Sequence, residues 1–259
     1  MPFLALLLLA LGTSTGADAR EPPRAVSVFP SGPEVPENLL RLTVTLAAPA
    51  SAPVLPLLAL RRVEGEPIDE PFLEQELWSS DGRTLTILMH PGRVKPGLDA
   101  HERLGRALKG GQDVVLTLAG REVHRWRVVA ADVQPPAPER WHLTLPAPGT
   151  RAPLVVRLDG PVEGQAVNLL AVSDAAGERV TGHARLDEGE GTWRFTPERP
   201  WRAGPHALRI HPLLEDAAGN RVGRRFEQAA APGETAVPGE DVTSSPRIDF
   251  TVSARPAVP

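Results

Sequence analysis

The sequence contains no cysteine and no tyrosine, and only Lys95 and Lys109 are lysines among its 28 basic residues. Without cysteine the chain can form no disulfide, no thiolate nucleophile and no cysteine-ligated metal site. An exported form of the chain must therefore be stabilised by its core alone. The formal net charge of −4 supplies no basic field, which argues against nucleic acid or an anionic membrane as a partner.

Long apolar runs are also scarce, and the clearest one lies at the N-terminus. Residues Phe3 to Leu11 are continuously apolar, and the small-residue pattern Ala17-Asp18-Ala19 follows. Such a run is too short to span a bilayer but fits a signal peptide. We predict that residues 1–19 are cleaved and that the mature chain is exported to the periplasm, the cell surface or the medium, with no stable membrane insertion. An apolar first strand and an uncleaved anchor are the alternatives.

Motifs for catalysis and for metal binding are lacking. There is no G-x-S-x-G and no H-E-x-x-H, and His206 and His211 are five residues apart, which places them on opposite faces of a strand. Neighbouring carboxylates lie in turn-rich stretches and are interpreted as solvated surface: Asp69/Glu70, Glu74/Glu76 and Asp187/Glu188/Glu190. We predict no enzyme activity, no metal and no cofactor. A hydrolase whose carboxylates meet only in three dimensions is an alternative.

Proline and glycine are abundant, with 29 and 23 residues, and they separate short apolar runs as turns do. The run at Leu39 to Pro49 alternates apolar and polar residues, which is typical of a half-buried strand. Ala25 to Phe29 and Thr84 to Met89 are further predicted strands, and Arg221 to Phe226 is a candidate for a last one. Residues 99–109 can form one short helical turn.

The strand pattern recurs after about 115 residues. Four stretches of the first half match four stretches of the second half in the same order. The stretches of the first half are LTVTLAAP, LLALRRVEGEPI, LWSSDGRTLTILMHPGRVKPG, which begins next to a tryptophan, and DVVLTLAG. Their counterparts are PLVVRLDGP, LLAVSDAAGERV, GTWRFTPERPWRAG and HALRIHPLLED. Such spacing predicts an all-β chain of two tandem Ig-like antiparallel β-sandwich domains. The predicted divisions after the signal peptide are an N-terminal sandwich at 20–133, a linker at 134–138, a second sandwich at 139–228, and a flexible segment at 229–259 with a possible edge strand at 247–252.

Trp193 and Trp201, together with Trp78, are the candidate ligand residues. Exposed tryptophan faces stack against sugar rings, so these three side chains could form a platform for carbohydrate. With so few aromatic residues in the chain, the alternative is that the tryptophans fill the core.

Two charged loops are candidates for binding an ion. Glu215, Asp216 and Asn220 supply oxygen atoms for calcium, but their spacing favours a turn with positive φ. Arg93 and Lys95 in PGRVKPG could contact an anion, whereas the simpler interpretation is a strand crossover with two solvated charges.

The second half resembles the bacterial Ig-like domains named after the SbsA surface-layer protein. The resemblance covers roughly residues 139–228 and rests on Trp193-x-Phe195-x-Pro197, the corner from Trp201 to Gly204, and Asp216-x-x-Gly219-Asn220. The common tyrosine of the apolar strand is missing. The whole chain is similar to exported bacterial proteins described as Ig-like domain-containing.

This resemblance implies a fold and a compartment, and it transfers no catalytic residue. The sequence predicts a non-catalytic module with structural or protein-binding roles in the bacterial envelope. Its partner would be an envelope protein or a cell-wall component. A carbohydrate-binding module that uses exposed tryptophan is the alternative, and the uncharacterised hydrolase is the third.

Overall fold

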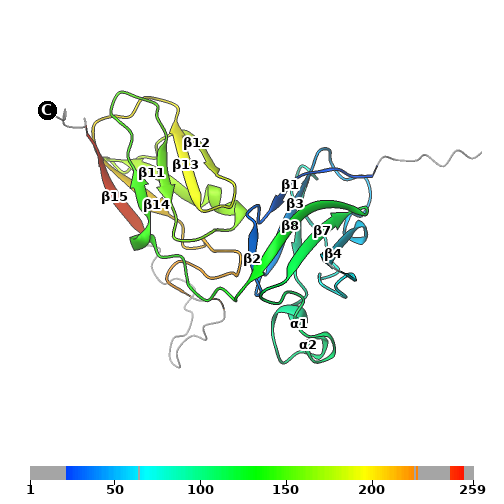
Figure 1. Ribbon diagram of the computed structural model, residues 1–259. Helices are drawn as coiled ribbons and strands as arrows, with labels where there is room; N and C mark the ends of the chain where they lie inside the picture. The colour runs from blue at the N-terminus through cyan, green and yellow to red at the C-terminus, as the bar shows by residue number, and fades with distance from the viewer. Residues whose placement is uncertain (1–21, 64, 225, 227–245, 254–259) are drawn as a thin grey trace, which may run out of the picture.

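The computed structural model describes residues 22–63, 65–224, 226 and 246–253, and its regular structure is almost entirely strand (Figure 1). The predicted signal peptide at residues 1–19 and most of the segment at 229–259 lie outside this part. Among the residues described, no helix has the length and apolar character needed to cross a bilayer. The predicted all-β class with antiparallel sheets is confirmed, apart from one short parallel strand pair.

The N-terminal half consists of two four-stranded sheets that enclose one hydrophobic cluster. The sheet orders are β1-β3-β6-β5 and β2-β8-β7-β4. The strands are β1 (Ala25–Phe29), β2 (Glu34–Pro36), β3 (Arg41–Leu46), β4 (Leu58–Arg62), β5 (Leu77–Trp78), β6 (Thr84–Leu88), β7 (Asp113–Leu118) and β8 (Arg121–Val129). Alternation explains the packing, because Leu42, Val44, Leu85 and Ile87 all point to one face and are completely buried.

The C-terminal half encloses a second, separate cluster, which contains Trp193, Phe195 and Trp201. Its sheets have the orders β12-β13-β10-β9 and β11-β14-β15. The strands are β9 (His142–Thr144), β10 (Leu154–Arg157), β11 (Leu170–Asp174), β12 (Gly182–Leu186), β13 (Thr192–Pro197), β14 (Gly204–Ile210) and β15 (Arg247–Val252).

The two halves share one strand connectivity. Strands β9 to β15 take the sheet positions of β1, β3, β4, β5, β6, β7 and β8, in that order. In both halves this gives the ABED and CFG sheets of an Ig-like sandwich. The internal repeat is therefore present, and its four matched stretches contain equivalent strands. The tryptophans are not equivalent, however, since Trp78 lies in β5 and Trp193 in β13.

The halves differ in how the last strand is placed. Strand β8 follows β7 through Ala119 and Gly120, both with positive φ, which is the geometry of a tight hairpin turn. It is also covered in part by β2, which pairs with it in parallel. In contrast, residues 211–246 separate β14 from β15, and among the described residues no strand pairs with the outer edge of β15.

The short helical segments lie outside the sheets. They are η1 (Leu55–Leu57), α1 (Pro91–Val94), α2 (Asp99–Leu104), η2 (Pro138–Arg140) and η3 (Gly164–Asn168). The helical turn expected within residues 99–109 is α2. The other helix, α1, falls on PGRVKPG, where the sequence analysis expected an extended loop.

That expectation was wrong for Arg93 in particular. Arg93 is 3% exposed, and its guanidinium donates to the carbonyl oxygen of Gly105 at 2.6 Å. Lys95 lies with its Nζ 4.6 Å from the ring centroid of Phe226. Pro91 starts the helix because proline fits the first helical position, and the His90 ring accepts from the Gly92 N–H.

One further strand prediction, Arg221 to Phe226, needs correction. Residues 221–224 form turns with isolated bridges in place of a strand. The strands on either side of Asp174 to Gly177 begin as a hairpin, with Val180 N–H donating to the Val172 carbonyl at 2.8 Å. They then separate into different sheets, because each finds a longer partner: β11 pairs with β14, and β12 pairs with β13.

Candidate functional site: the junction between the halves

The two halves contact each other through a polar junction whose first contact is Ser31 with Glu190. Ser31 lies just after β1, and Glu190 lies in the turn before β13. The Ser31 hydroxyl donates to Glu190 Oε1 at 2.5 Å, and the Ser31 N–H donates to Oε2 at 3.1 Å. The Gly189 N–H in turn donates to the Ser31 hydroxyl at 2.9 Å. Glu190 has φ 51°, a left-handed conformation that these contacts hold in place.

Small residues are needed where these turns approach. A Cβ atom on Gly32 would lie 3.2 Å from the Gly189 Cα. A side chain on Gly32 would therefore require the two backbones to move apart by a few tenths of an ångström.

The second contact is a charged group around Arg41 of β3. Its guanidinium pairs with Glu215 and lies 3.8 Å from Glu163 Oε1. The two acidic residues are also joined through the backbone, where the Glu163 N–H donates to the Glu215 carbonyl at 2.9 Å. One cation from the N-terminal half thus offsets two carboxylates of the C-terminal half.

The third contact is the Asp216-to-Asn220 loop. Asp216 Oδ1 accepts from the backbone N–H groups of Ala218 and Asn220, and Oδ2 accepts from the Asn220 amide at 2.8 Å. The Asn220 amide reaches the Asp132 carbonyl at 3.2 Å. This confirms the turn interpretation of the loop, because both carboxylate oxygens are engaged by N–H donors of the chain itself.

The loop also docks beside the start of β3. The Leu40 N–H donates to the Ala217 carbonyl at 3.2 Å, and the Ala217 side chain joins the hydrophobic cluster of the N-terminal half. Gly219 has φ 82°, and a Cβ there would lie 2.4 Å from Leu40 Cδ1. Glycine is favoured at this position by its left-handed conformation, and a Cβ atom would also displace the end of the Leu40 side chain.

Burial makes the junction electrostatically unusual. Glu163, Glu190 and Asp216 are all buried. Burial raises the pKa of Glu163 and of Glu190 above the usual range for glutamate, against the opposing effects of Arg41 and of Ser31. Burial likewise raises the pKa of Asp216 to about 6, although hydrogen bonds from Asn220 oppose the shift. The protonation of Asp216 therefore changes in the mildly acidic range.

The candidate ligand tryptophans do not form an exposed platform. Trp193 is completely buried and Trp201 is 3% exposed, because both fill the C-terminal core and their indole N–H groups donate to the carbonyls of Val167 and Ala152. Trp78 is half-buried and donates to Glu76 Oε2 at 2.8 Å. The structure does not bring the three side chains together, since Trp78 belongs to the N-terminal half.

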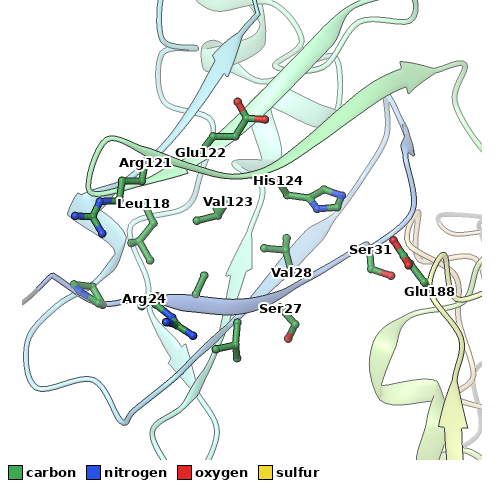
Figure 2. A pocket seen from close by; sticks show the side chains of 13 residues that line it. Arg24, Ser27, Val28, Ser31, Leu118, Arg121, Glu122, Val123, His124 and Glu188 are labelled. Carbon is green, nitrogen blue, oxygen red and sulfur yellow. The ribbon is translucent and has the colours of Figure 1, made fainter.

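A mixed groove of about 410 Å³ opens between β1 and the start of β8 (Figure 2). Arg121 and Glu122 line it from β8, and Ser27 lines it from β1. The equivalent place in the C-terminal half, between residues 134–141 and the start of β15, holds a groove of about 800 Å³. Both grooves run between the edges of two sheets, a shape that suits an extended chain better than a small molecule.

The remaining candidate residues are dispersed. Within the described part of the chain, no group of three or more His, Asp or Glu is arranged to hold a metal ion. Several of the neighbouring carboxylates have structural partners: Glu70 pairs with Arg103, and Asp187 pairs with Arg185 and Arg194. Glu190, interpreted from sequence as solvated, is instead buried in the junction.

The sequence analysis missed most of the junction. Ser31, Arg41, Asp132 and Glu163 belong to no motif and meet only through the fold. The one available signal was Asp216-x-x-Gly219-Asn220, whose turn chemistry is local. Which surface that turn docks on cannot be read from the loop itself.

No protein-family model matches the sequence, and no curated protein matches it. Solved structures to which it is similar include a biofilm-associated protein at 10% identity, with 73% of this chain covered and a TM-score of 0.24. The chain spans 26% of that structure. It is also similar to the Escherichia coli adhesin FdeC at 14% identity, covering 74% of this chain and 60% of that one, with a TM-score of 0.24. The N-terminal part of the bacterial S-layer protein SbsC matches at 12% identity, covering 73% and 41%, with a TM-score of 0.26. Scores this low establish neither a family nor a function.

Proposed function

We propose that the chain is a non-catalytic, exported Ig-like module that carries or binds another protein in the bacterial envelope. The observation that carries this proposal is the junction. Charged side chains are buried there at a desolvation cost, which only a retained set of hydrogen bonds offsets. A pair of independently mobile modules would have no need for such a surface. A spacer or adhesion module that must hold two sandwiches at one angle does need it.

The proposal is tested with the exported chain, purified and immobilised as bait for fractionated envelope, with cell-wall polysaccharide as a parallel bait. A retained envelope protein that binds the purified chain directly supports the protein-binding role. Binding should weaken in Gly219→Ala, because this variant loosens the junction without touching either groove. Turnover of envelope substrates by the chain would overturn the proposal.

Export is tested separately. Cell fractionation should place the chain outside the cytoplasm, and mass spectrometry of its N-terminus should give Arg20 as the first residue. A chain found in the cytoplasm with its first residues intact would contradict this part of the proposal.

A carbohydrate-binding role depends on Trp78, the least buried of the five tryptophans. If polysaccharide retains the chain and Trp78→Ala abolishes retention, the module binds sugar. Leu77→Ala is the control, because Leu77 is an exposed neighbour of Trp78 in β5. Phe72→Ala is not suitable, because Phe72 lies in the core.

A further inference from the structure

Strand β15 closes the C-terminal sandwich, and within the described part of the chain no strand pairs with its outer edge. It pairs with β14 in regular antiparallel register over all six of its residues. The Ile210 N–H donates to the Pro246 carbonyl at 2.9 Å, which fixes the alternation of the ladder. Ile248, Phe250 and Val252 therefore direct their backbone groups toward β14, and Arg247, Asp249 and Thr251 direct theirs away from it.

Among the described residues, none forms a hydrogen bond with these outward backbone groups. The neighbouring segment carries Pro135, Pro136 and Pro138, which have no N–H to donate; it contacts β15 through η2 and lines, together with the start of β15, a groove of about 800 Å³. The equivalent strand β8 is protected differently. It is covered by β2 at one end, and its register shifts at the other, a device that discourages added strands.

Other edges are less suited to strand addition. Strand β1 has a register shift between Ala25 and Ser27. The edges of β4 and β11 are met by the residues that follow them, through bonds from Ile68 to Leu60 and from Val180 to Val172. Strand β15 is longer than these strands and regular, and its sequence RIDFTV is rich in residues that favour strands.

The charges on the exposed face of β15 select its partner. Arg247 and Asp249 lie two residues apart on this face, with their charged groups 3.4 Å apart, and both side chains are more than half exposed. A two-fold axis that passes through Ile248 places a second copy of the strand antiparallel to the first. Arg247 of each copy then faces Asp249 of the other, which gives two pairs of opposite charge. A pairing centred on Asp249 would instead oppose two carboxylates, which is unfavourable.

We propose that two copies of this chain pair antiparallel through β15, with Ile248 opposite Ile248 at the two-fold axis. The outward backbone groups of Arg247 and Asp249 then form four hydrogen bonds across the axis. The two sheets become one continuous six-stranded sheet, and the four charges alternate in sign across its exposed face. The interface is isologous, so the association stops at a dimer.

A charge-swap series tests the proposal in the exported chain by analytical ultracentrifugation over the micromolar range. Arg247→Asp or Asp249→Arg alone should weaken the dimer by roughly tenfold, because each change replaces attraction by repulsion at both cross-axis pairs. The double variant R247D/D249R should restore wild-type association. Circular dichroism should be unchanged in all three, since both residues are exposed. A monomeric wild type, or a double variant no better than the singles, would overturn the proposal.

Cysteine variants fix the register, because the natural chain has no cysteine to interfere. Residues opposite each other in a non-hydrogen-bonded pair lie about 4.5 Å apart at Cα, which a disulfide can bridge. Ile248→Cys should therefore form a covalent dimer on mild oxidation, and the matched variant Asp249→Cys should not. The reverse result would overturn the proposed register, and crosslinking of neither variant would overturn the interface.

Discussion

The two halves of the molecule have the same strand connectivity but complete their second sheet in different ways. In the N-terminal half, β8 follows β7 through a two-residue turn and is partly covered by β2. In the C-terminal half, β15 arrives after residues 211–246, and no strand of the described residues pairs with its outer edge. The first of the intervening residues have a structural role, because they include the Asp216-to-Asn220 loop, which docks beside the start of β3. The second half thus uses its long connection to build the junction, and it leaves a strand edge unprotected in doing so.

The largest expected effect compares equivalent core positions in the closing strands, Trp126 in β8 and Phe250 in β15. Both are buried. Replacement of either by alanine should lower the free energy of unfolding by about 3–5 kcal/mol through lost burial and a residual cavity. Urea denaturation of each variant measures this loss of unfolding free energy.

The shape of that transition tells whether the halves unfold as one unit. If the junction couples them, both variants shift a single transition. Two separate transitions, with only one moved by each variant, would show that the junction does not transmit stability. Val26→Ala, an exposed position in β1, serves as the control and should change little.

The next effect is on pH dependence. The pKa of Asp216 is about 6 in the folded chain and higher than that of an unfolded aspartate, so the folded state binds the proton more tightly. Stability from this group is lost as pH rises through 6 and is gained as pH falls toward 4. The gain in unfolding free energy should reach on the order of 3 kcal/mol.

Urea titrations between pH 5 and pH 7.5 measure this slope, with Asp216→Asn as the matched variant. Asparagine can still accept from the two backbone N–H groups but cannot titrate. Its pH slope should be shallower, although Glu163 and Glu190 keep part of it in the same direction because their pKa values are also raised. Equal slopes in the two proteins would contradict the prediction.

A smaller effect is expected from Gly219→Ala. A Cβ at this position meets Leu40, and the left-handed conformation is strained for alanine. The cost should be about 1–3 kcal/mol, confined to the junction. Gly177→Ala is the control, because its φ is also positive but nothing lies within 4 Å of the added atom. Small-angle scattering should show a wider range of angles between the halves for Gly219→Ala than for Gly177→Ala.

The sequence was sufficient for most of the strands and insufficient for their contacts across the halves. Alternation in Leu40 to Leu46 and the Gly-Asn turn at residues 219 and 220 are local signals, and both are found as predicted. Arg93 was mispredicted because a charged residue between prolines and glycines looks solvated unless the fold that covers it is known. The pairing of Ser31 with Glu190 spans most of the chain, and no local pattern encodes it.

The long connection before β15 also affects the order in which the two halves can fold during synthesis. During synthesis the N-terminal half can close once the short segment from Ala119 to the end of β8 at Val129 has been made. The residues from His211 to Val252 must all be made before the C-terminal half can close. At ~5–20 residues per second this takes roughly 2–8 s. Throughout that interval the edge of β14 is unpaired, so we expect this strand to be the part of the nascent chain that most needs a chaperone or rapid export.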